Sequence, residues 1–124
     1  MADFPKSERL CSRKAIDTLF RGGNGTRAMT VFPIRMVYGA RQDGEGHQVL
    51  ISVSKRHFKH AVQRNRVKRQ LREAWRNHKF QLDGLDTSFH IAFIWLADEL
   101  FDTKAVDQRI CKLLDRLSNP RCHS

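Results

Sequence analysis

Three segments of the chain alternate between apolar and other side chains with a period of two residues. They cover residues 31–38, 48–54 and 88–97. Because successive side chains of a β-strand point to opposite faces, each segment is expected to form a strand. Pro33 favours an edge position or the start of a strand for the first segment. Turn-forming residues at 41–47 connect the first two segments, which are therefore expected to pair as a hairpin.

The third of these segments carries apolar side chains on both faces. One face would hold Phe89, Ile91, Phe93 and Trp95, and the other would hold His90, Ala92, Ile94 and Leu96. Strands that are buried on both faces read as nearly continuous apolar runs. We therefore expect residues 88–97 to form a central strand that is covered on both sides.

Apolar residues spaced three and four apart predict three helices, since this spacing places them on one helical face. The first begins near Ser12, a suitable N-terminal cap, and ends at Gly22-Gly23. The second is a strongly basic segment over about residues 59–80, and the third covers about residues 103–117 with Asp102 as its cap. The apolar positions of the first helix are Ile16, Leu19 and Phe20.

These elements follow one another in the order α-β-β-α-β-α, with room for a further short strand before the basic helix. This mixture of helices and strands indicates an α+β fold in which helices pack on a sheet as a sandwich. A chain of 124 residues is long enough for one modest core. We expect a single domain over residues 1–124, with an ordered core at about 9–117 and frayed ends at 1–8 and 118–124.

The composition also bears on location. The longest apolar run, residues 91–97, is much shorter than the run of about 18 residues that suggests a membrane helix. The first residues contain no apolar stretch typical of a secretory signal. The three cysteines, Cys11, Cys111 and Cys122, are an odd number without paired spacing, which favours reduced thiols. These features predict a cytoplasmic protein that does not enter a membrane.

Positive charge is concentrated in one segment of the chain. The protein has a net charge of +10, and residues 55–79 alone hold ten Lys and Arg residues and a single acid, Glu73. The remaining 99 residues are nearly neutral, with thirteen basic and twelve acidic side chains. Such a concentration of like charge repels itself unless a polyanionic partner neutralises it.

The basic segment divides into two sides when it is placed on a helical wheel. Its apolar side holds Val67, Leu71, Ala74, Trp75 and His78. Its opposite side holds Asn65, Lys68, Arg69, Arg72, Arg76 and Lys79, with Arg64 and Arg66 on the flanks. We expect the apolar side to pack on the sheet and the cationic side to face outward.

A charged helix face can simply be solvated, which is the usual explanation of such a run. A solvated face normally mixes cations with acids, because like charges one turn apart destabilise a helix by about 0.2–0.5 kcal/mol per pair. Here Lys68, Arg72 and Arg76 follow one another along the face with no acid between them. Five of the six cations at 64–76 are arginine, whose planar guanidinium pairs with phosphate and stacks on bases. The segment therefore predicts a nucleic-acid partner.

The surroundings of the helix favour RNA over DNA. A helix that reads DNA in the major groove usually mixes Asn, Gln, Ser or Thr with its cations and belongs to a helix-turn-helix. The basic helix lies between predicted strands, and its outer side is almost entirely suited to phosphates. A-form RNA is recognised through its shape, its backbone and its exposed single strands.

Histidines suggest metal binding or acid–base catalysis, but their spacing does not support either. His57, His60 and His78 have no Cys or carboxylate nearby in sequence that would complete a metal site, and they are expected to contribute to RNA contact. His90 is expected to be a hydrogen-bonded residue of the core. No arrangement of nucleophile, base and acid is legible. We therefore expect no catalytic residue and no metal site in the protein.

The residues around the basic helix resemble the signature of the bacterial ribonuclease P protein subunit. The matching stretches are Ser52–Arg56 and Ala61–Trp75, with the core Arg64-Asn65-Arg66-Val67-Lys68-Arg69. Arg9-Leu10, followed by Ile16, Leu19, Phe20 and Gly22, is similar to the opening helix of that family. The resemblance extends from about Arg9 to Leu117, which is nearly the whole chain.

The resemblance implies a partner and a function. Members of the family pair with a large catalytic RNA, ribonuclease P RNA, and help to remove the 5′ leader of precursor tRNA. The RNA performs the hydrolysis with divalent ions such as Mg²⁺, so the protein itself would bind no cofactor. The resemblance also implies a left-handed β-α-β crossover, against the usual right-handed rule. Two other hypotheses are a ribosomal or RNA-assembly protein with no role in cleavage, and a nuclease that works alone through histidine chemistry.

The resemblance also implies roles for particular residues. By position, the catalytic RNA would contact Arg64, Asn65, Arg66, Lys68, Arg69 and Arg72, and the helical wheel adds Arg76. Lys55, Arg56 and Lys59 would lie close to the catalytic RNA or the leader. The leader cleft would be lined by Ile16, Phe20 and Arg35, although packing under the first helix is an equal alternative for Phe20.

Ile16 departs from the family pattern, which commonly has an aromatic residue at this position. An aliphatic side chain packs on a base but cannot stack with it, and such stacking contributes about 1–3 kcal/mol per base. Arg35 is expected beside the same cleft, where its charge could replace the lost stacking. The affinity of the leader, or its dependence on leader sequence, is expected to differ from that of the aromatic relatives.

Overall fold

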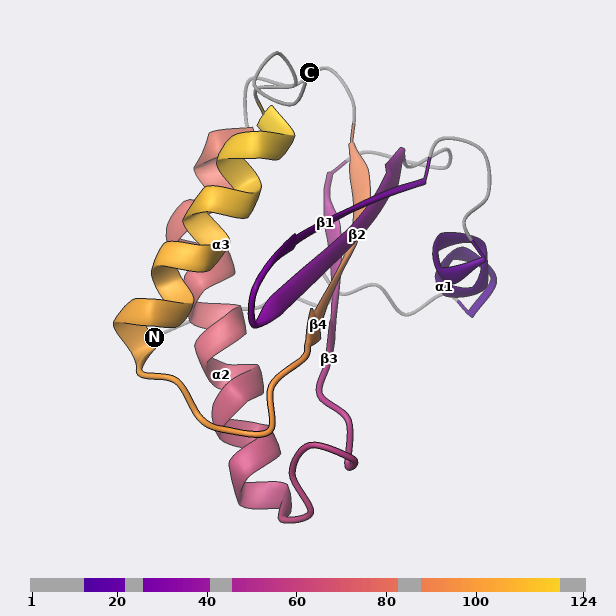
Figure 1. Cartoon of the computed structure of the whole chain (residues 1–124). Helices are drawn as coiled ribbons and strands as arrows, with labels where there is room; N and C mark the ends of the chain where they lie inside the picture. The colour runs from indigo at the N-terminus through magenta and orange to yellow at the C-terminus, as the bar shows by residue number, and fades with distance from the viewer. Residues whose placement is uncertain (1–12, 22–25, 41–45, 83–87, 119–124) are drawn as a thin grey trace.

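Four strands form one mixed sheet in the computed structural model, and three α-helices cover its two faces (Figure 1). The structure describes residues 13–21, 26–40, 46–82 and 88–118. The helices are α1 (Arg13–Phe20), α2 (Ala61–His78) and α3 (Thr103–Ser118), and the short 3-10 helix η2 (Lys79–Leu82) follows α2. The strands are β1 (Arg27–Val31), β2 (Ile34–Ala40), β3 (Gln48–Ser52) and β4 (Phe89–Trp95).

The order of strands in the sheet is β1-β2-β4-β3. β1 pairs antiparallel with β2, β2 pairs antiparallel with β4, and β3 pairs parallel with β4. β3 and β4 are parallel neighbours, so the chain must cross over between them, and α2 with η2 forms most of this connection. The basic helix is therefore joined to the edge strand at one end and leads toward the central strand at the other.

The predicted hairpin between residues 31–38 and 48–54 is wrong. β4 lies between these two segments and pairs with both. Its apolar side chains on both faces favour this central, doubly covered position. The hairpin of this sheet joins β1 to β2 instead, through a turn at Phe32 and Pro33. The single strand predicted over 31–38 is broken there, since proline lacks the N–H that a continuous ladder requires. β1 is the further short strand for which the predicted order left room.

Of the two positions expected for Pro33, one is wrong and the other is confirmed. An edge position is wrong for the strand that follows it, because β2 lies inside the sheet. A strand start is confirmed, since Pro33 immediately precedes the first residue of β2. Its carbonyl accepts a 2.8 Å hydrogen bond from the N–H of Leu96, just beyond the end of β4.

The main core lies between the sheet and the pair α2 and α3, which run side by side on one face (Figure 1). The strands contribute Ile34, Met36, Val49, Ile91, Phe93 and Trp95 to this core, and the helices contribute Val67, Leu71, Trp75, Val106, Ile110, Leu113 and Leu114. Each fully buried aliphatic side chain of this size stabilises the fold by about 1.5–3 kcal/mol. The rings of Trp75 and Phe93 lie 6.2 Å apart and fix α2 against β4. Both tryptophans are core residues, as predicted.

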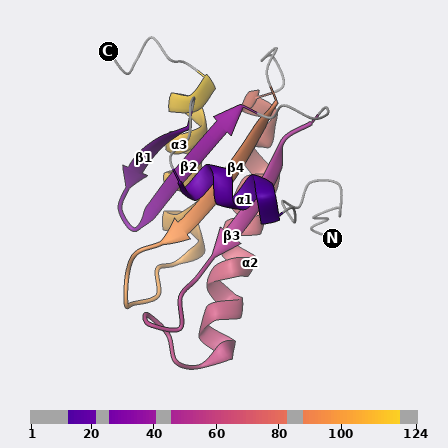
Figure 2. The ribbon, with the colours of Figure 1, turned by 90° about the vertical axis from the view of Figure 1, so that its right-hand side faces the viewer.

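α1 covers the opposite face of the sheet, and Figure 2 shows it crossing in front of the strands. Leu19 packs there with Val37 of β2 and Ala92 of β4. Ile16, Leu50 and Ile94 surround this smaller cluster. The predicted central strand with two covered faces is therefore confirmed, because β4 contributes to the cores on both sides.

The predicted helices agree closely with the observed ones. The helix predicted over 59–80 corresponds to α2, which begins two residues later, and to the start of η2, and α3 spans the predicted third helix with one further residue. Asp102 caps α3 as predicted, since its carboxylate accepts a 2.9 Å hydrogen bond from the N–H of Ala105. The predicted ends of the first helix, Ser12 and Gly22-Gly23, lie outside the described residues, as do Arg9-Leu10 and most of both predicted frayed ends. In the described part of the chain, no helix is long and apolar enough to cross a bilayer.

Candidate nucleic-acid interface

α2 has one side in the core and one side in water, as the helical wheel predicts. Val67, Leu71, Ala74 and Trp75 are buried. Gln70 is buried as well, with only 5% of its surface exposed, which the wheel did not predict. Its side-chain amide donates hydrogen bonds to the carbonyl of Phe101 at 3.0 Å and to the hydroxyl of Thr103 at 3.2 Å. These bonds tie the middle of α2 to the start of α3.

The outer side of α2 carries the predicted RNA-binding residues. Asn65, Arg66, Arg69 and Arg76 are exposed, and Lys68 and Arg72 are half-buried. The guanidinium of Arg72 reaches back along the helix to the carbonyl of Lys68, at 3.4 Å. Arg66 and Arg69 have no side-chain partner among the residues that the structure describes. The Arg side chains therefore leave their N–H groups available to a phosphate backbone.

Arg76, at the far end of this side, differs from the others. It contacts Glu73 at 3.4 Å, three residues earlier on the same helix. Both side chains are more than one-third exposed, so solvent screens the pair and its contribution to stability is small. Glu73 nevertheless places a negative charge beside the last arginine of the row.

The loop before α2 adds three exposed cations to the surface. Lys55, Arg56 and Lys59 are exposed, whereas Phe58 between them is buried with 4% of its surface accessible. The hydroxyl of Ser54 accepts a 3.0 Å hydrogen bond from the N–H of Arg56. The carbonyl of Ser54 accepts further bonds from the N–H groups of the next residues, including His57 at 3.1 Å. The loop is thus held in a compact turn with its cations outward.

Arg64 occupies a different position from the rest of the motif. Its Nη1 donates a 2.8 Å hydrogen bond to the carbonyl of Phe58 and a 3.0 Å bond to the carbonyl of Lys59. The side chain therefore folds back from the first turns of α2 onto the preceding loop. Sequence reasoning placed Arg64 on the flank of the helix but could not find these contacts.

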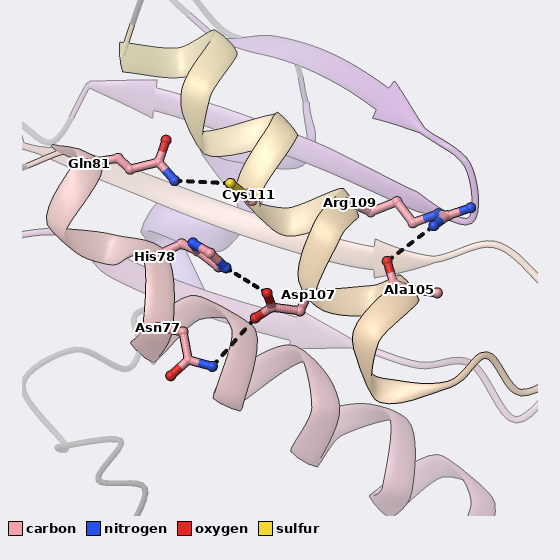
Figure 3. Close-up of polar contacts among 7 residues, drawn as sticks. All are labelled: Asn77, His78, Gln81, Ala105, Asp107, Arg109 and Cys111. Carbon is pink, nitrogen blue, oxygen red and sulfur yellow. Dashed lines mark hydrogen bonds and ion pairs between the residues drawn. The ribbon is translucent and has the colours of Figure 1, made fainter.

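Two histidines of the basic segment contact acidic side chains that lie much later in the sequence. His57 contacts Asp98 at 2.5 Å, and His78 contacts Asp107 on α3 at 2.8 Å. Figure 3 shows His78 and Asn77 reaching the same carboxylate from the C-terminal end of α2. In the described residues, no group of three or more His, Cys, Asp or Glu side chains is assembled around a metal-sized space. These histidines brace the two ends of α2.

A hollow of about 270 Å³ lies on the opposite face of the sheet, between α1 and the strands β1 and β2. Phe20 and Arg35, two of the residues expected in the leader cleft, both line it, and the ring of Phe20 is 47% exposed. The structure does not bring Ile16 to this hollow: Ile16 packs on the cluster of Leu19, Val37 and Ala92. Two further lining residues, Thr26 and Arg27, were not predicted, because their segment shows little alternation.

The hollow combines several kinds of chemistry. Leu19, Ala28, Val37 and Ile94 make it apolar, and Thr26 adds a hydroxyl. Arg35 brings a guanidinium group to it, whereas Arg27 lines it from β1 with its side chain directed, like those of Met29 and Tyr38, toward the opposite face of the sheet. Arg27 pairs in register with Tyr38, whose phenol pKa is raised by burial although the nearby charge of Arg27 opposes the shift. An exposed aromatic ring beside a guanidinium suits a nucleotide, which has a base to stack and a phosphate to pair.

The comparison with known families decides which RNA-binding proteins this chain resembles. A family model described as Ribonuclease P matches residues 4–118. The chain belongs to the ribonuclease P protein family. It is 40% identical to the ribonuclease P protein component of Porphyromonas gingivalis W83 over 119 residues, which covers 91% of this chain and 85% of that protein. It is 39% identical to the ribonuclease P protein component of Chlorobium phaeobacteroides over 79 residues, or 62% of this chain and 54% of that protein.

Solved ribonuclease P proteins have the same fold. The protein from Thermotoga maritima superposes with a TM-score of 0.71 at 22% identity, over 88% of this chain and 96% of that one. The protein from Staphylococcus aureus superposes with a TM-score of 0.70 at 18% identity, over 92% of this chain and 97% of that one. Together with the sequence relatives, these matches confirm the first of the three hypotheses. The chain is the protein subunit of the endoribonuclease ribonuclease P and assists 5′ processing of precursor tRNA. Its family makes ribonuclease P RNA and precursor tRNA its partners.

Proposed function

We propose that the outer side of α2 and the loop before it dock on ribonuclease P RNA. The docking surface consists of Lys55, Arg56, Lys59, Arg64, Asn65, Arg66, Lys68, Arg69, Arg72 and Arg76. The observation that carries this proposal is the pair of exposed guanidiniums of Arg66 and Arg69, which have no acidic partner in the described structure. Each phosphate that such a group neutralises releases counterions, which drives binding.

We also propose that the hollow beneath α1 holds part of the 5′ leader. Phe20 would stack on a base, while Arg35 would pair with a neighbouring phosphate. Ile16 would act indirectly, by supporting Leu19 and the helix from which Phe20 projects. The guanidinium of Arg35 would supply charge where the aromatic residue common in the family is replaced by Ile16.

We infer that the chemistry of cleavage belongs to the RNA subunit. Hydrolysis would use Mg²⁺ held by the RNA, and the protein would contribute binding and orientation without a cofactor of its own. The protein is proposed to work in the cytoplasm as a single domain over residues 1–124, on RNA and not on DNA or membranes. The connection from β3 through α2 to β4 is proposed to be left-handed, as the family resemblance implies.

Reconstitution of the holoenzyme tests the docking surface. The protein is mixed with a bacterial ribonuclease P RNA and precursor tRNA at low Mg²⁺, and cleavage is measured. We expect strong stimulation by the protein and no cleavage without the RNA. Arg69→Ala should weaken binding to the RNA subunit and reduce the slope of log K against log salt by about 0.7–0.9, because one phosphate contact is lost.

A matched control is Lys112→Ala, which removes one exposed cation from α3. It should leave both the affinity and the salt slope unchanged. Equal effects of the two variants would contradict the docking surface and point to a general charge effect. Cleavage by the protein without RNA would overturn the assignment of the chemistry.

A further inference from the structure

We propose that Arg64 is a positioning residue, which acts on RNA through the loop before α2 and not mainly as a phosphate ligand. This inference rests on the proposed docking surface. Arg64 would hold residues 54–60 so that Lys55, Arg56 and Lys59 lie beside the cations on the outer side of α2 before RNA binds. The loop and the helix would then form one preformed surface.

The contacts of Arg64 support this role. Its Nη1 donates to the carbonyls of both Phe58 and Lys59, at 2.8 and 3.0 Å. Two bonds from one charged group to consecutive carbonyls fix both the height and the angle of the chain at that point. They join the part of the loop that enters the core, at Phe58, to the part that carries a cation, at Lys59. A guanidinium committed in this way is less free to move to a phosphate.

The start of α2 explains why such a support is needed. His60 is the N-terminal cap residue, and it makes no side-chain capping bond. No acid occupies the first turn of the helix to offset its dipole. Without a capping side chain, the entry of the chain into the helix is fixed only by backbone bonds to the carbonyl of His60. Arg64 cannot cap the helix, because a guanidinium only donates hydrogen bonds, but its two bonds to the carbonyls of Phe58 and Lys59 tie the loop to the first turns of α2.

Electrostatics point in the same direction. Three exposed cations on a short loop repel one another and repel Arg64, so an untethered loop would be expected to spread them apart. The two carbonyl dipoles stabilise the guanidinium and offset this repulsion locally. His57, which contacts Asp98 at 2.5 Å, provides a second tie on the far side of the loop. The loop is therefore held from two sides, by an arginine of α2 and by an acid of the β4–α3 connection.

A double-mutant cycle separates positioning from direct contact. The salt slope of binding to ribonuclease P RNA is measured for the intact chain, for Arg64→Ala, for the triple variant Lys55→Ala/Arg56→Ala/Lys59→Ala, and for the triple variant carrying Arg64→Ala. In the intact background, Arg64→Ala should lower the slope by about 1.4 or more, the equivalent of two lost contacts. In the triple background it should lower the slope by less than about 0.4, because no loop cation remains to be misplaced.

Arg69→Ala is the matched control, since Arg69 lies on the same helix without a described partner. It should lower the slope by the same amount in both backgrounds. Arg64→Met, which keeps the aliphatic stem, replaces Arg64→Ala if that variant does not fold. Amide hydrogen exchange of the free protein should show faster exchange at His57 and Phe58 in either Arg64 variant and not in Arg69→Ala.

The outcomes distinguish the inference from the function on which it rests. If Arg64→Ala has the same effect in both backgrounds, Arg64 is a direct contact and the inference is overturned. If the triple variant binds normally while Arg69→Ala binds weakly, the loop does not touch RNA, and the inference falls while the docking role of α2 stands. If neither variant changes binding, the docking surface itself is wrong.

Discussion

Single side chains of the docking surface fall into two groups with different expected roles. Arg66 and Arg69 are exposed and have no partner among the described residues, so they are ready to bind phosphate. Arg64 and Arg76 are already engaged, with loop carbonyls and with Glu73 respectively. All four residues contribute equally to the net charge, but their contacts make them unequally available to phosphate. Two predictions at the scale of residues follow from such contacts.

Replacement of Glu73 by Gln should increase the affinity for ribonuclease P RNA. The change frees Arg76 from its ion pair and removes the only acid of the basic segment, while the amide keeps the size of the side chain. The salt slope should rise by about 0.7–0.9 if Arg76 gains a phosphate. Asp115→Asn, which removes an exposed acid from α3, is the control and should have little effect. Equal gains in both variants would show that only overall charge matters.

Phe20→Ala should weaken the binding of precursor tRNA more than the binding of mature tRNA, since only the precursor has a leader. Loss of one stacked base corresponds to about 1–3 kcal/mol, and Phe20→Tyr should retain most of it. Equilibrium binding of both tRNAs to the holoenzyme checks the prediction. Phe32→Ala removes another exposed ring, from the β1–β2 turn, and should not discriminate between them. A similar loss for both tRNAs with Phe20→Ala would place the ring outside the leader path.

At the scale of elements, α2 works because its two sides have separate tasks. Val67, Leu71 and Trp75 fix the helix on the sheet, and the opposite side is left to the RNA. The ends are braced by acids from neighbouring segments, Asp98 near the start and Asp107 near the end. The helix is therefore held at its middle and at both ends before any partner binds.

Asp107→Ala should lower the free energy of unfolding by about 1–2 kcal/mol. The carboxylate accepts hydrogen bonds from His78 and Asn77, and each bond lost costs about 1 kcal/mol. Urea unfolding of the free protein measures the change. Because Asp107 lies away from the loop cations, the salt slope for RNA binding should stay the same. A large fall in that slope would mean that Asp107 also shapes the docking surface.

For the whole molecule, the net charge of +10 sets a balance between stability and binding. Positive groups crowded on one side of a small fold repel one another, and dissolved salt screens this repulsion. The same salt competes with the phosphates of the RNA. Stability of the free protein and affinity for RNA should therefore respond to salt in opposite directions.

Thermal unfolding of the free protein should accordingly shift to higher temperature between about 50 and 200 mM salt, while RNA binding weakens. A protein that makes six to ten phosphate contacts loses a factor of about 10³–10⁵ in affinity over this range. The triple loop variant should show a smaller shift in the unfolding temperature than the intact protein. A free protein that becomes less stable with added salt would contradict self-repulsion as the main effect of its charge.

The sequence predicts local features of this fold better than long-range ones. The two sides of α2, the cap at Asp102 and the central position of residues 88–97 depend on neighbours in sequence, and all three are confirmed. The partner of β3 does not, because alternation shows that a segment is a strand but not which strand lies beside it.

In the candidate site, too, local features could be predicted from the sequence and long-range contacts could not. The motif around Arg64, and the presence of Phe20 and Arg35 near one cleft, were expected from the resemblance. Ala28 enters the hollow only through the pairing of β1 with β2, which the expected hairpin did not include. The bonds of Arg64 to the loop, and the acids that meet His57 and His78, depend on how separate segments approach one another. Spacing along the chain carries no signal for such approaches.

β4 lies between the hollow and α2, which carries the docking surface on its far side. Phe93 faces α2 and supports Trp75, while its neighbour Ile94 faces the other way and lines the hollow. A substitution that shifts this strand would therefore displace α2 and the hollow at the same time. Substitutions of surface residues should therefore change the affinity for either ribonuclease P RNA or the leader alone. Substitutions within β4 should change both affinities.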